Sequence, residues 1–141
     1  MLWMYTTEGR KDFSQKDIQI EEKELDFICD MGCNFIRLPI DYRFFVQDFN
    51  YGNSNEKMLK VLDSCVESII SRGLHCSLNI HRAPGYCING AETERHNLWK
   101  DKEAEDEFSR LWKDFAIRYS NYTENQLSFD LLNEPPNINQ Y

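Results

Sequence analysis

The feature that most constrains this chain is the regular alternation of amphipathic helical segments with short apolar runs. Helices are expected over residues 14–32, 53–73 and 101–119, and strands over residues 33–39, 74–80 and 127–132. Strands that alternate with helices of about ten residues or more are typical of β-α-β units with a parallel sheet. The pattern therefore predicts an α/β fold. Because no linker and no further repeat interrupts it, it also predicts a single domain over residues 1–141.

The composition excludes several classes of protein. With 41% hydrophobic and 28% charged residues, the 141-residue chain has the composition of a globular domain and not of a disordered one. Its net charge of −8 argues against binding to nucleic acid and to anionic membrane surfaces. No apolar run approaches the length of a membrane span. An acidic surface fits a neutral substrate, and it fits simple solubility equally well.

Two features bear on the compartment in which the protein works. Residues 1–10 lack the basic start, apolar core and small-residue cleavage site of a signal peptide. The five cysteines are an odd number, and none belongs to a C-x-x-C pair. We therefore expect small buried thiols and neither a disulfide framework nor a zinc site. Both features favour a cytoplasmic location.

Polar residues close each of the three predicted strands. Arg37 lies near the end of the first, His81 follows the second, and Asn133 with Glu134 follows the third. A lone histidine or arginine is more often a structural residue, but three such strand ends predict one convergent site, because the carboxyl ends of parallel strands meet at one edge. A buried Arg37 would also require a carboxylate partner.

The third strand end has its own constraint. The apolar run before Asn133 predicts a strand that is covered on both faces, and Pro135 ends it and biases Glu134 toward extended backbone. Since successive strand residues point to opposite faces, Asn133 and Glu134 can serve one site only if the backbone bulges there. The alternative is that the Asn-Glu-Pro sequence is simply a turn.

Other kinds of site have weaker support. A metal site could include His81 and Glu134, but His75 lies at the start of its strand and His96 in a loop, so no metal is expected. Cys87 is the one conceivable thiol partner of a histidine, and we discount it. The sequence has no G-x-S-x-G, no G-x-G-x-x-G and no P-loop, so no nucleotide cofactor is expected.

Three blocks of sequence resemble glycoside hydrolase family 5, the cellulase-type barrel glycosidases. They are Asn34-Phe35-Ile36-Arg37-Leu38-Pro39, Asn79-Ile80-His81-Arg82-Ala83-Pro84-Gly85-Tyr86 and Phe129-Asp130-Leu131-Leu132-Asn133-Glu134-Pro135. The resemblance covers residues 14–136. It implies part of a (β/α)8 barrel, from the first helix through the fourth strand, and retaining hydrolysis of β-linked polysaccharide, as in an endoglucanase or a related enzyme.

The resemblance also implies roles for individual residues. Glu134 corresponds to the general acid/base, and Asn133 to the residue that holds the 2-hydroxyl of the sugar. His81 corresponds to a contact with the sugar at the cleavage point, and Arg37 to the residue that orients the nucleophilic carboxylate. Exposed aromatic side chains are expected to stack on sugar rings; the candidates are Tyr86, Trp99 and the aromatic residues of segment 42–51.

One part of the family pattern is missing. The nucleophile of the family is a glutamate at the end of the seventh strand, and this chain matches the family only as far as strand four. We therefore expect an N-terminal part of a glycosidase that is inactive alone and that self-associates through its open sheet edges. The alternative is a non-catalytic carbohydrate-binding or scaffold half-barrel. The choice among glucan, mannan and xylan stays open, and the habit of the family favours secretion.

Overall fold

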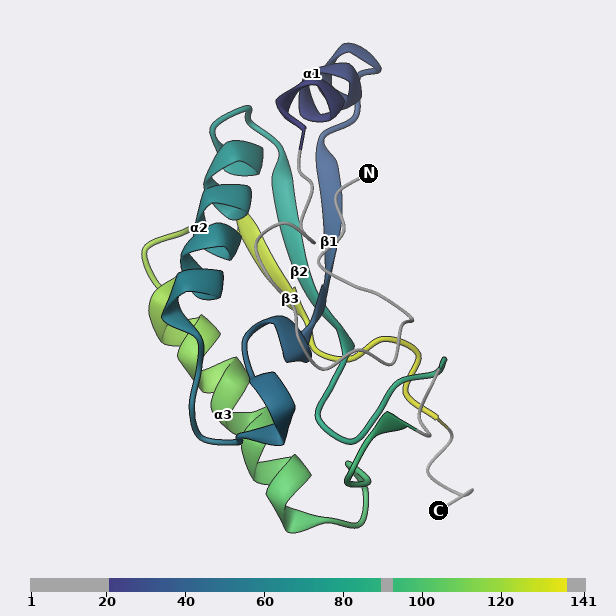
Figure 1. Cartoon of the computed structure of the whole chain (residues 1–141). Coiled ribbons are helices and arrows are strands. Elements are labelled where there is room, and N and C mark those ends of the chain that lie inside the picture. Colours follow the sequence, from purple (N-terminus) through teal and green to yellow (C-terminus); the bar gives the residue numbers. More distant parts are fainter. Residues whose placement is uncertain (1–20, 90–92, 137–141) are drawn as a thin grey trace.

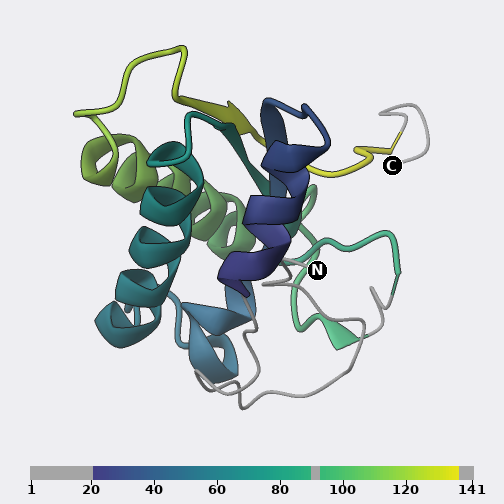
Figure 2. The ribbon, with the colours of Figure 1, turned by 90° about the horizontal axis from the view of Figure 1, so that it is seen from above.

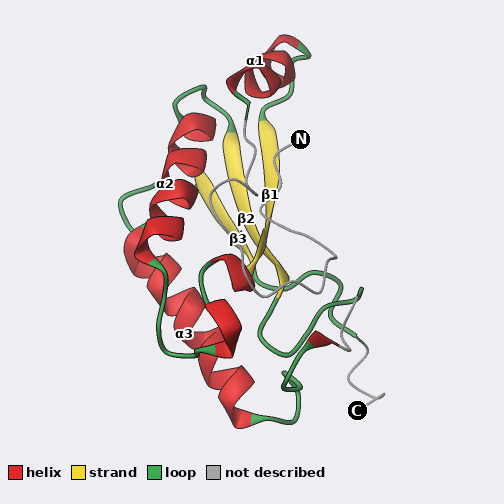
Figure 3. Cartoon of the chain, viewed as in Figure 1, coloured by secondary structure: helices red, strands yellow, loops and turns green. Residues whose placement is uncertain are grey.

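The computed structural model describes residues 21–89 and 93–136. Its elements, in chain order, are α1 (Glu22–Asp30), β1 (Phe35–Asp41), the short 3₁₀ helices η2 (Tyr42–Phe44) and η3 (Gln47–Phe49), α2 (Glu56–Ile70), β2 (His75–Arg82), α3 (Lys102–Arg118) and β3 (Leu127–Asp130) (Figures 1 and 3). The predicted alternation of helices and strands is confirmed. The part of the first predicted helix before residue 21 lies outside the described residues.

The three strands form one parallel sheet in the order β1-β2-β3. Phe35 of β1 is level with His75 of β2, and Leu78 of β2 is level with Phe129 of β3. The chain returns from β1 to β2 through α2 and from β2 to β3 through α3. Both helices lie on the same face of the sheet, whereas α1 lies at the amino-terminal ends of the strands (Figures 1 and 2). The parallel sheet predicted from the alternation is confirmed.

The helices form where the sequence combines a start signal with an apolar stripe. The Asn55 side chain accepts hydrogen bonds from the backbone N–H groups of Lys57 and Met58 and so caps α2. Gly73, at a φ of +75°, takes the left-handed conformation that ends a helix without a steric penalty. The buried residues of α2 are Met58, Leu59, Leu62, Cys65, Val66 and Ile69. In α3 the apolar stripe buries Leu111 and Phe115, whereas Ala116 beside them is exposed.

The two faces of the sheet differ in chemistry, because successive strand residues point to opposite sides. One face is apolar: Ile36, Leu38 and Ile40 of β1 are buried in the same cluster as the stripes of α2 and α3. The residues in register on the other face are mostly polar; they include Arg37, Ser77, Asn79, Ser128 and Asp130. The sheet therefore separates a hydrophobic core from a face lined with polar side chains.

The aromatic segment 42–51 belongs mostly to the core. Tyr42, Phe44 and Phe45 are 1%, 2% and 1% exposed, and the Phe45 ring packs edge-on against Phe115 with a centroid distance of 5.8 Å. Phe49 is half-buried beneath the guanidinium of Arg95. The expectation that this segment presents rings to a sugar is wrong for Tyr42, Phe44 and Phe45, because burial in the core competes for the same apolar surface.

The third strand is shorter and more open than the sequence predicts. It ends at Asp130, and Phe129 and Leu131 are 39% and 57% exposed. The expectation of cover on both faces is wrong here, because within the described part of the chain only Trp112 of α3 packs its ring on Phe129. Within residues 21–89 and 93–136, no strand pairs with the outer edge of β1 or of β3.

The cysteines are all free thiols. Cys65, Cys76 and Cys87 are buried as predicted, Cys29 is partly buried, and Cys33 is exposed. Burial raises the pKa of the Cys65 and Cys76 thiols to about 12, so both stay protonated at neutral pH. None of the helices described is long and apolar enough to cross a membrane.

Candidate active site

Arg37 connects two strands that are not neighbours in the sheet. It is the third residue of β1 and lies level with Ser77, so it does not occupy the strand end as the sequence suggested. Its long side chain nevertheless reaches β3 and the segment after it. Nε lies 2.8 Å from Oδ2 of Asp130, and Nη2 donates to Oδ1 of Asn133 over 2.9 Å. Asp130 is thus the carboxylate that Arg37 was expected to require.

The backbone after β3 contains a bulge. In the regular part of the ladder, Asn79 is level with Asp130, and continued pairing would bring the N–H of Leu132 to the carbonyl of Ile80. The N–H of Asn133 donates to that carbonyl instead, over 3.1 Å. One extra residue is therefore inserted between Asp130 and Asn133, and the regular alternation of strand faces is broken before Asn133.

Glu134 adopts an unusual backbone conformation. Its φ is +45°, in the left-handed region that non-glycine residues seldom occupy. The expectation of extended backbone at Glu134 is wrong, because contacts with distant segments, at the N–H of Asn133 and the carbonyl of Glu134, outweigh the local steric bias of Pro135. The carbonyl of Glu134 accepts a hydrogen bond from the Tyr86 hydroxyl, and the residue as a whole is exposed. The Glu134 side chain therefore projects from a backbone that Tyr86 binds, at a strand end that is exposed to solvent.

Asn133 is buried, at 4% exposure, and only part of its amide is used. Oδ1 accepts the hydrogen bond from Arg37. Its Nδ2 group is buried and has no hydrogen-bond partner in the described part of the chain. A buried amide N–H without a partner costs free energy, so this donor is suited to a ligand oxygen.

His81 is the second-last residue of β2, so it stands at the carboxyl end of the central strand. Its Nδ1 is 3.1 Å from Oδ1 of Asn79, whose Nδ2 donates to the carbonyl of Asp130 over 3.2 Å. Partial burial and then the positive charge of Arg37 lower the pKa of His81, against the opposing effect of Glu134 and Asp130. His81 is therefore neutral at pH 7, so one ring nitrogen donates and the other accepts.

The two aromatic residues predicted to contact sugar differ in exposure. Trp99 is 40% exposed, as expected of a ring that can stack on a ligand. Tyr86 is only 7% exposed, so the expectation that its ring is on the surface is wrong. Its ring packs against Trp99 with a centroid distance of 5.8 Å and an interplanar angle of 67°. Trp99 covers Tyr86, and Tyr86 in turn contacts the backbone that carries Glu134.

Sequence reasoning did not find a buried ion pair beneath the loop that follows β2. Nε of Arg82 lies 2.6 Å from Oε1 of Glu94, and both side chains are 1% exposed or less. Oε2 of the same carboxylate accepts from the hydroxyl of Tyr42 and from the backbone N–H of Gly85. The available signal was Arg82 itself, a charged residue at the buried end of a strand.

A second buried pair lies at the end of β1. Asp41 is fully buried and binds Arg43, with Nη2 of Arg43 2.7 Å from Oδ2 of Asp41. Burial raises the pKa of Asp41, and the hydrogen bonds and charge of Arg43 act against that rise. This pair fixes the turn from β1 into η2.

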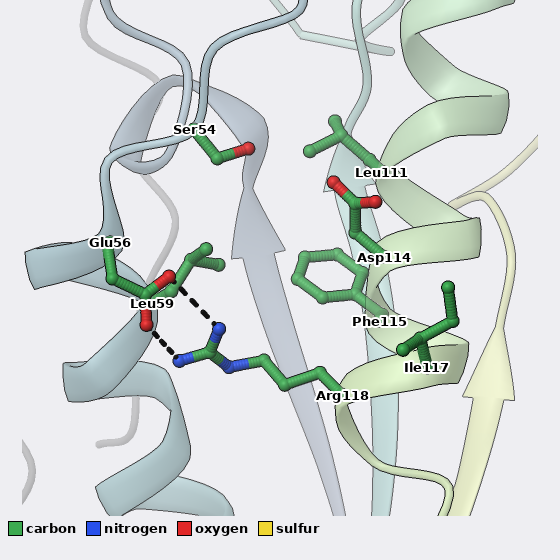
Figure 4. A pocket seen from close by; sticks show the side chains of 8 residues that line it. All are labelled: Ser54, Glu56, Leu59, Leu111, Asp114, Phe115, Ile117 and Arg118. Atoms are coloured by element: carbon green, nitrogen blue, oxygen red, sulfur yellow. Dashed lines mark hydrogen bonds and ion pairs between the residues drawn. The ribbon is translucent and has the colours of Figure 1, made fainter.

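Other candidate sites are not assembled. No group of three or more His, Cys, Asp or Glu side chains suited to a metal occurs among residues 21–89 and 93–136. His75 lies at the start of β2, where its Nε2 is 2.8 Å from the Ser128 hydroxyl. A pocket between α2 and α3 contains the ion pair of Arg118 with Glu56 (Figure 4). None of its lining residues belongs to the group around Glu134.

The chain matches known proteins along almost all of its length. Residues 5–141 match the sequence profile of Cellulase (glycosyl hydrolase family 5). Endoglucanase C of Acetivibrio thermocellus is 35% identical over 118 residues, which cover 84% of this chain and 34% of that protein. The chain thus spans about a third of the length of this relative.

Solved structures give the same result. A crystal structure of a glycoside hydrolase matches with a TM-score of 0.87 and 45% identity, over 99% of this chain and 42% of that one. Cel5A of Thermotoga maritima, solved in complex with cellobiose, matches with a TM-score of 0.66 and 26% identity, over 90% of this chain and 37% of that one. These neighbours are (β/α)8 barrels, so the predicted fold class, part of such a barrel, is confirmed. The chain belongs to glycoside hydrolase family 5, the cellulase family.

Proposed function

We propose that Glu134 is the general acid/base of a retaining glycosidase that hydrolyses β-linked glucan. The observation that supports this proposal is the irregular backbone after β3, with a bulge before Asn133 and a φ of +45° at Glu134. On this segment Asn133 binds Arg37, and Glu134 lies close enough to His81 to affect its pKa. A regular strand would point Asn133 and Glu134 to opposite faces. Active sites of barrel enzymes lie at the carboxyl ends of the strands, and this is such an end (Figure 1).

The mechanism uses Glu134 twice. In the first step the protonated carboxyl group gives its proton to the glycosidic oxygen while a second carboxylate attacks the anomeric carbon, so the bond to the leaving sugar breaks and a glycosyl ester forms. In the second step the Glu134 carboxylate takes a proton from water, whose oxygen displaces the ester. The exposed position of Glu134 at the strand end allows both exchanges.

We propose that the second carboxylate comes from outside the described residues. In a retaining enzyme the two carboxyl groups lie about 5 Å apart across the sugar. Asp130 is the carboxylate that Arg37 binds, but it lies in the regular part of β3 on the far side of the bulge from Glu134. We expect residues 1–141 alone to be inactive, because the family has its nucleophile at the end of the seventh strand and this chain matches the family only as far as the fourth. The outer edges of β1 and β3, which no strand within residues 21–89 and 93–136 pairs with, would then bind further strands or other copies of the chain.

Three residues of the candidate site are suited to hold the sugar. Nδ2 of Asn133, which has no hydrogen-bond partner among the residues that the structure describes, would donate to the 2-hydroxyl, the contact that strengthens as the transition state forms. Neutral His81 would exchange a hydrogen bond with a second hydroxyl. The exposed ring of Trp99 would stack on a sugar face. Endoglucanase C and the cellobiose complex of Cel5A support β-glucan as the substrate.

The test is hydrolysis of soluble β-glucan by the natural-length protein, its Glu134→Gln variant and a Glu67→Gln control on the exposed surface of α2. We expect Glu134→Gln to lower kcat by about 10²- to 10⁴-fold, the usual contribution of general acid–base catalysis. Glu67→Gln should leave it unchanged. Unchanged kcat in Glu134→Gln would contradict the proposal. Oligosaccharide binding without turnover, lost in Trp99→Ala but kept in Glu134→Gln, would instead indicate a carbohydrate-binding half-barrel.

A further inference from the structure

The hydroxyl of Tyr86 donates a hydrogen bond to the backbone carbonyl of Glu134 across 48 residues of sequence. The two heavy atoms lie 2.5 Å apart. The bond joins the loop that follows β2 to the segment that follows β3, and these segments lie close together at the same end of the sheet (Figure 1). It holds the main chain of Glu134 and leaves the carboxylate uninvolved.

Glu134 is a residue whose backbone needs such an anchor. Its φ of +45° costs free energy for a non-glycine residue, and a conformation of this kind persists only where the surroundings fix it. The regular ladder ends at Asp130, and the next residue after Glu134 is Pro135, which has no N–H to donate. The Tyr86 hydrogen bond is therefore a contact that fixes the peptide from which the Glu134 side chain projects.

Tyr86 is itself rigidly placed. Its N–H donates to the carbonyl of Ala83 over 3.0 Å, and its carbonyl accepts from the N–H of Ala83 over 2.9 Å. The preceding residue, Gly85, packs so closely that an added Cβ would lie 2.6 Å from the backbone nitrogen of Leu98. Trp99 covers the ring, as described above. A hydroxyl held this way is a fixed reference point for the backbone that it binds.

We propose that Tyr86 is a positioning residue that holds the Glu134 carboxyl group at the distance from the glycosidic oxygen that proton transfer requires. This inference rests on the proposed role of Glu134. Tyr86 acts through the Glu134 carbonyl and not on the sugar, since its ring is buried. Proton transfer requires a heavy-atom separation of about 2.6–3.2 Å, so a small shift of the peptide lowers its rate.

The leaving group of the substrate separates this role from a general loss of structure. A sugar leaving group needs a proton from Glu134 as the glycosidic bond breaks, whereas a dinitrophenolate leaves without one because it is a stable anion. The parameter to compare is kcat/KM, because it reports only the steps up to the first irreversible one and so excludes hydrolysis of the glycosyl ester. A misplaced acid lowers kcat/KM for the first substrate alone.

The experiment compares natural-length protein with Tyr86→Phe, which keeps the buried ring and removes the hydroxyl. The substrates are cellotetraose and 2,4-dinitrophenyl β-cellobioside. We expect Tyr86→Phe to lower kcat/KM for cellotetraose by about ten- to hundredfold, as for a misplacement below about 1 Å. For the dinitrophenyl substrate the change should stay below about twofold, since no proton is transferred. The control is Tyr119→Phe. Tyr119 lies at the end of α3, and the change removes its hydroxyl, which donates a hydrogen bond to Asp63 of α2 and belongs to a buried residue.

The outcomes distinguish this inference from the proposed function. Equal loss with both substrates in Tyr86→Phe, or no loss with either, overturns the positioning role. Glu134→Gln serves as the reference, because removal of the acid itself must show the same dependence on the leaving group. If Glu134→Gln shows that dependence and Tyr86→Phe does not, only the inference on Tyr86 fails. If Glu134→Gln lacks it, the proposed function fails whatever Tyr86→Phe does.

Discussion

Arg37 and Asn133 are 96 residues apart in the sequence, and Nη2 of Arg37 donates to Oδ1 of Asn133 over 2.9 Å. This hydrogen bond joins the first strand of the sheet to the bulge beyond the third. It fixes the orientation of the Asn133 amide, because an amide whose oxygen is held by a guanidinium must present its NH₂ group elsewhere. Arg37 thereby selects which atoms of Asn133 face a substrate.

The first prediction concerns Arg37→Lys. A lysine has one ammonium group and cannot reproduce the fork that reaches Asp130 and Asn133 together. We expect kcat/KM on β-glucan to fall by about tenfold or more through loss of amide orientation. The melting temperature should change little, because the Arg37–Asp130 pair is 40% and 36% exposed and such pairs contribute about 0–1 kcal/mol.

The matched control for this change is Arg72→Lys. Arg72 also spans two partners, Asp26 and Glu22, but it connects the turn after α2 to α1 at the other end of the sheet. Its replacement should leave kcat/KM unchanged. Equal losses of kcat/KM in the two variants, measured under the same conditions, would refute a specific role for Arg37.

The second prediction concerns the titration of His81. Partial burial and the charge of Arg37 lower its pKa below the ordinary 6.5, and Glu134 and Asp130 oppose the effect. Arg37→Met should therefore raise the pKa of His81, and Glu134→Gln should lower it, as followed by NMR of the imidazole C–H signals. Glu67→Gln, on the surface of α2, should change nothing.

The sign of the effect on stability follows from the same shift. The unfolded chain binds a proton at the ordinary pKa of 6.5, whereas folded His81 binds it only at lower pH. His81 therefore leaves stability unaffected well above pH 6.5 and decreases it as the pH falls below that value. Urea unfolding of His81→Gln between pH 5 and pH 8 should show a weaker acid-side decline than the unchanged protein; an identical decline would contradict this assignment.

The third prediction concerns Glu94→Ala. The change leaves the fully buried guanidinium of Arg82 without its carboxylate, and the loss of one partner of a buried pair costs about 3–5 kcal/mol. Urea unfolding should show this loss directly. Asp106→Ala removes the partner of Lys102 in a pair that is mostly exposed, and its unfolding midpoint should not move. Similar urea unfolding midpoints for the two variants would mean that the Glu94 carboxylate does not stabilise the fold in this way.

The fourth prediction compares two glycines with the same backbone conformation. Gly85 and Gly73 have φ values of +74° and +75°, so alanine is strained at both positions by about 1–2 kcal/mol. An added Cβ at Gly73 meets nothing within 4 Å, whereas at Gly85 it lies 2.6 Å from the nitrogen of Leu98. Gly85→Ala should therefore lose about 1–3 kcal/mol more than Gly73→Ala through overpacking. Equal midpoints in urea unfolding would contradict the close packing described.

Much of the fold could be predicted because it follows from local patterns. The stripe of α2 with its cap at Asn55, and the glycine stop at Gly73, each depend on residues a few positions apart. The alternation of such elements then required a parallel sheet, which the structure has. The exposure of Phe129 and Leu131 could not be predicted, because whether an apolar strand residue is covered depends on distant segments of the chain.

The candidate site could be predicted only in part, for the same reason. The need of Arg37 for a carboxylate was evident, but the choice of Asp130 depends on the register between strands. Tyr86 was expected on the surface because nothing in its own segment shows that Trp99 covers it. The left-handed backbone of Glu134 was not predicted, since it arises from the bulge and the hydrogen bond from Tyr86.

The carboxylate of Glu94 has a consequence for engineering this scaffold. It accepts hydrogen bonds from Tyr42, in the loop after β1, and from Arg82 and Gly85, at the end of β2 and in the loop after it. Loops on barrel enzymes are usually treated as independent modules that can be exchanged one at a time. Here two of these loops depend on the same buried carboxylate, that of Glu94. A graft that replaces the loop after β2 alone would remove Glu94 and leave the Tyr42 hydroxyl and the Arg82 guanidinium unmatched, and a graft of the loop after β1 alone would remove the Tyr42 donor from the Glu94 carboxylate. The two loops must therefore be transplanted and diversified as one unit.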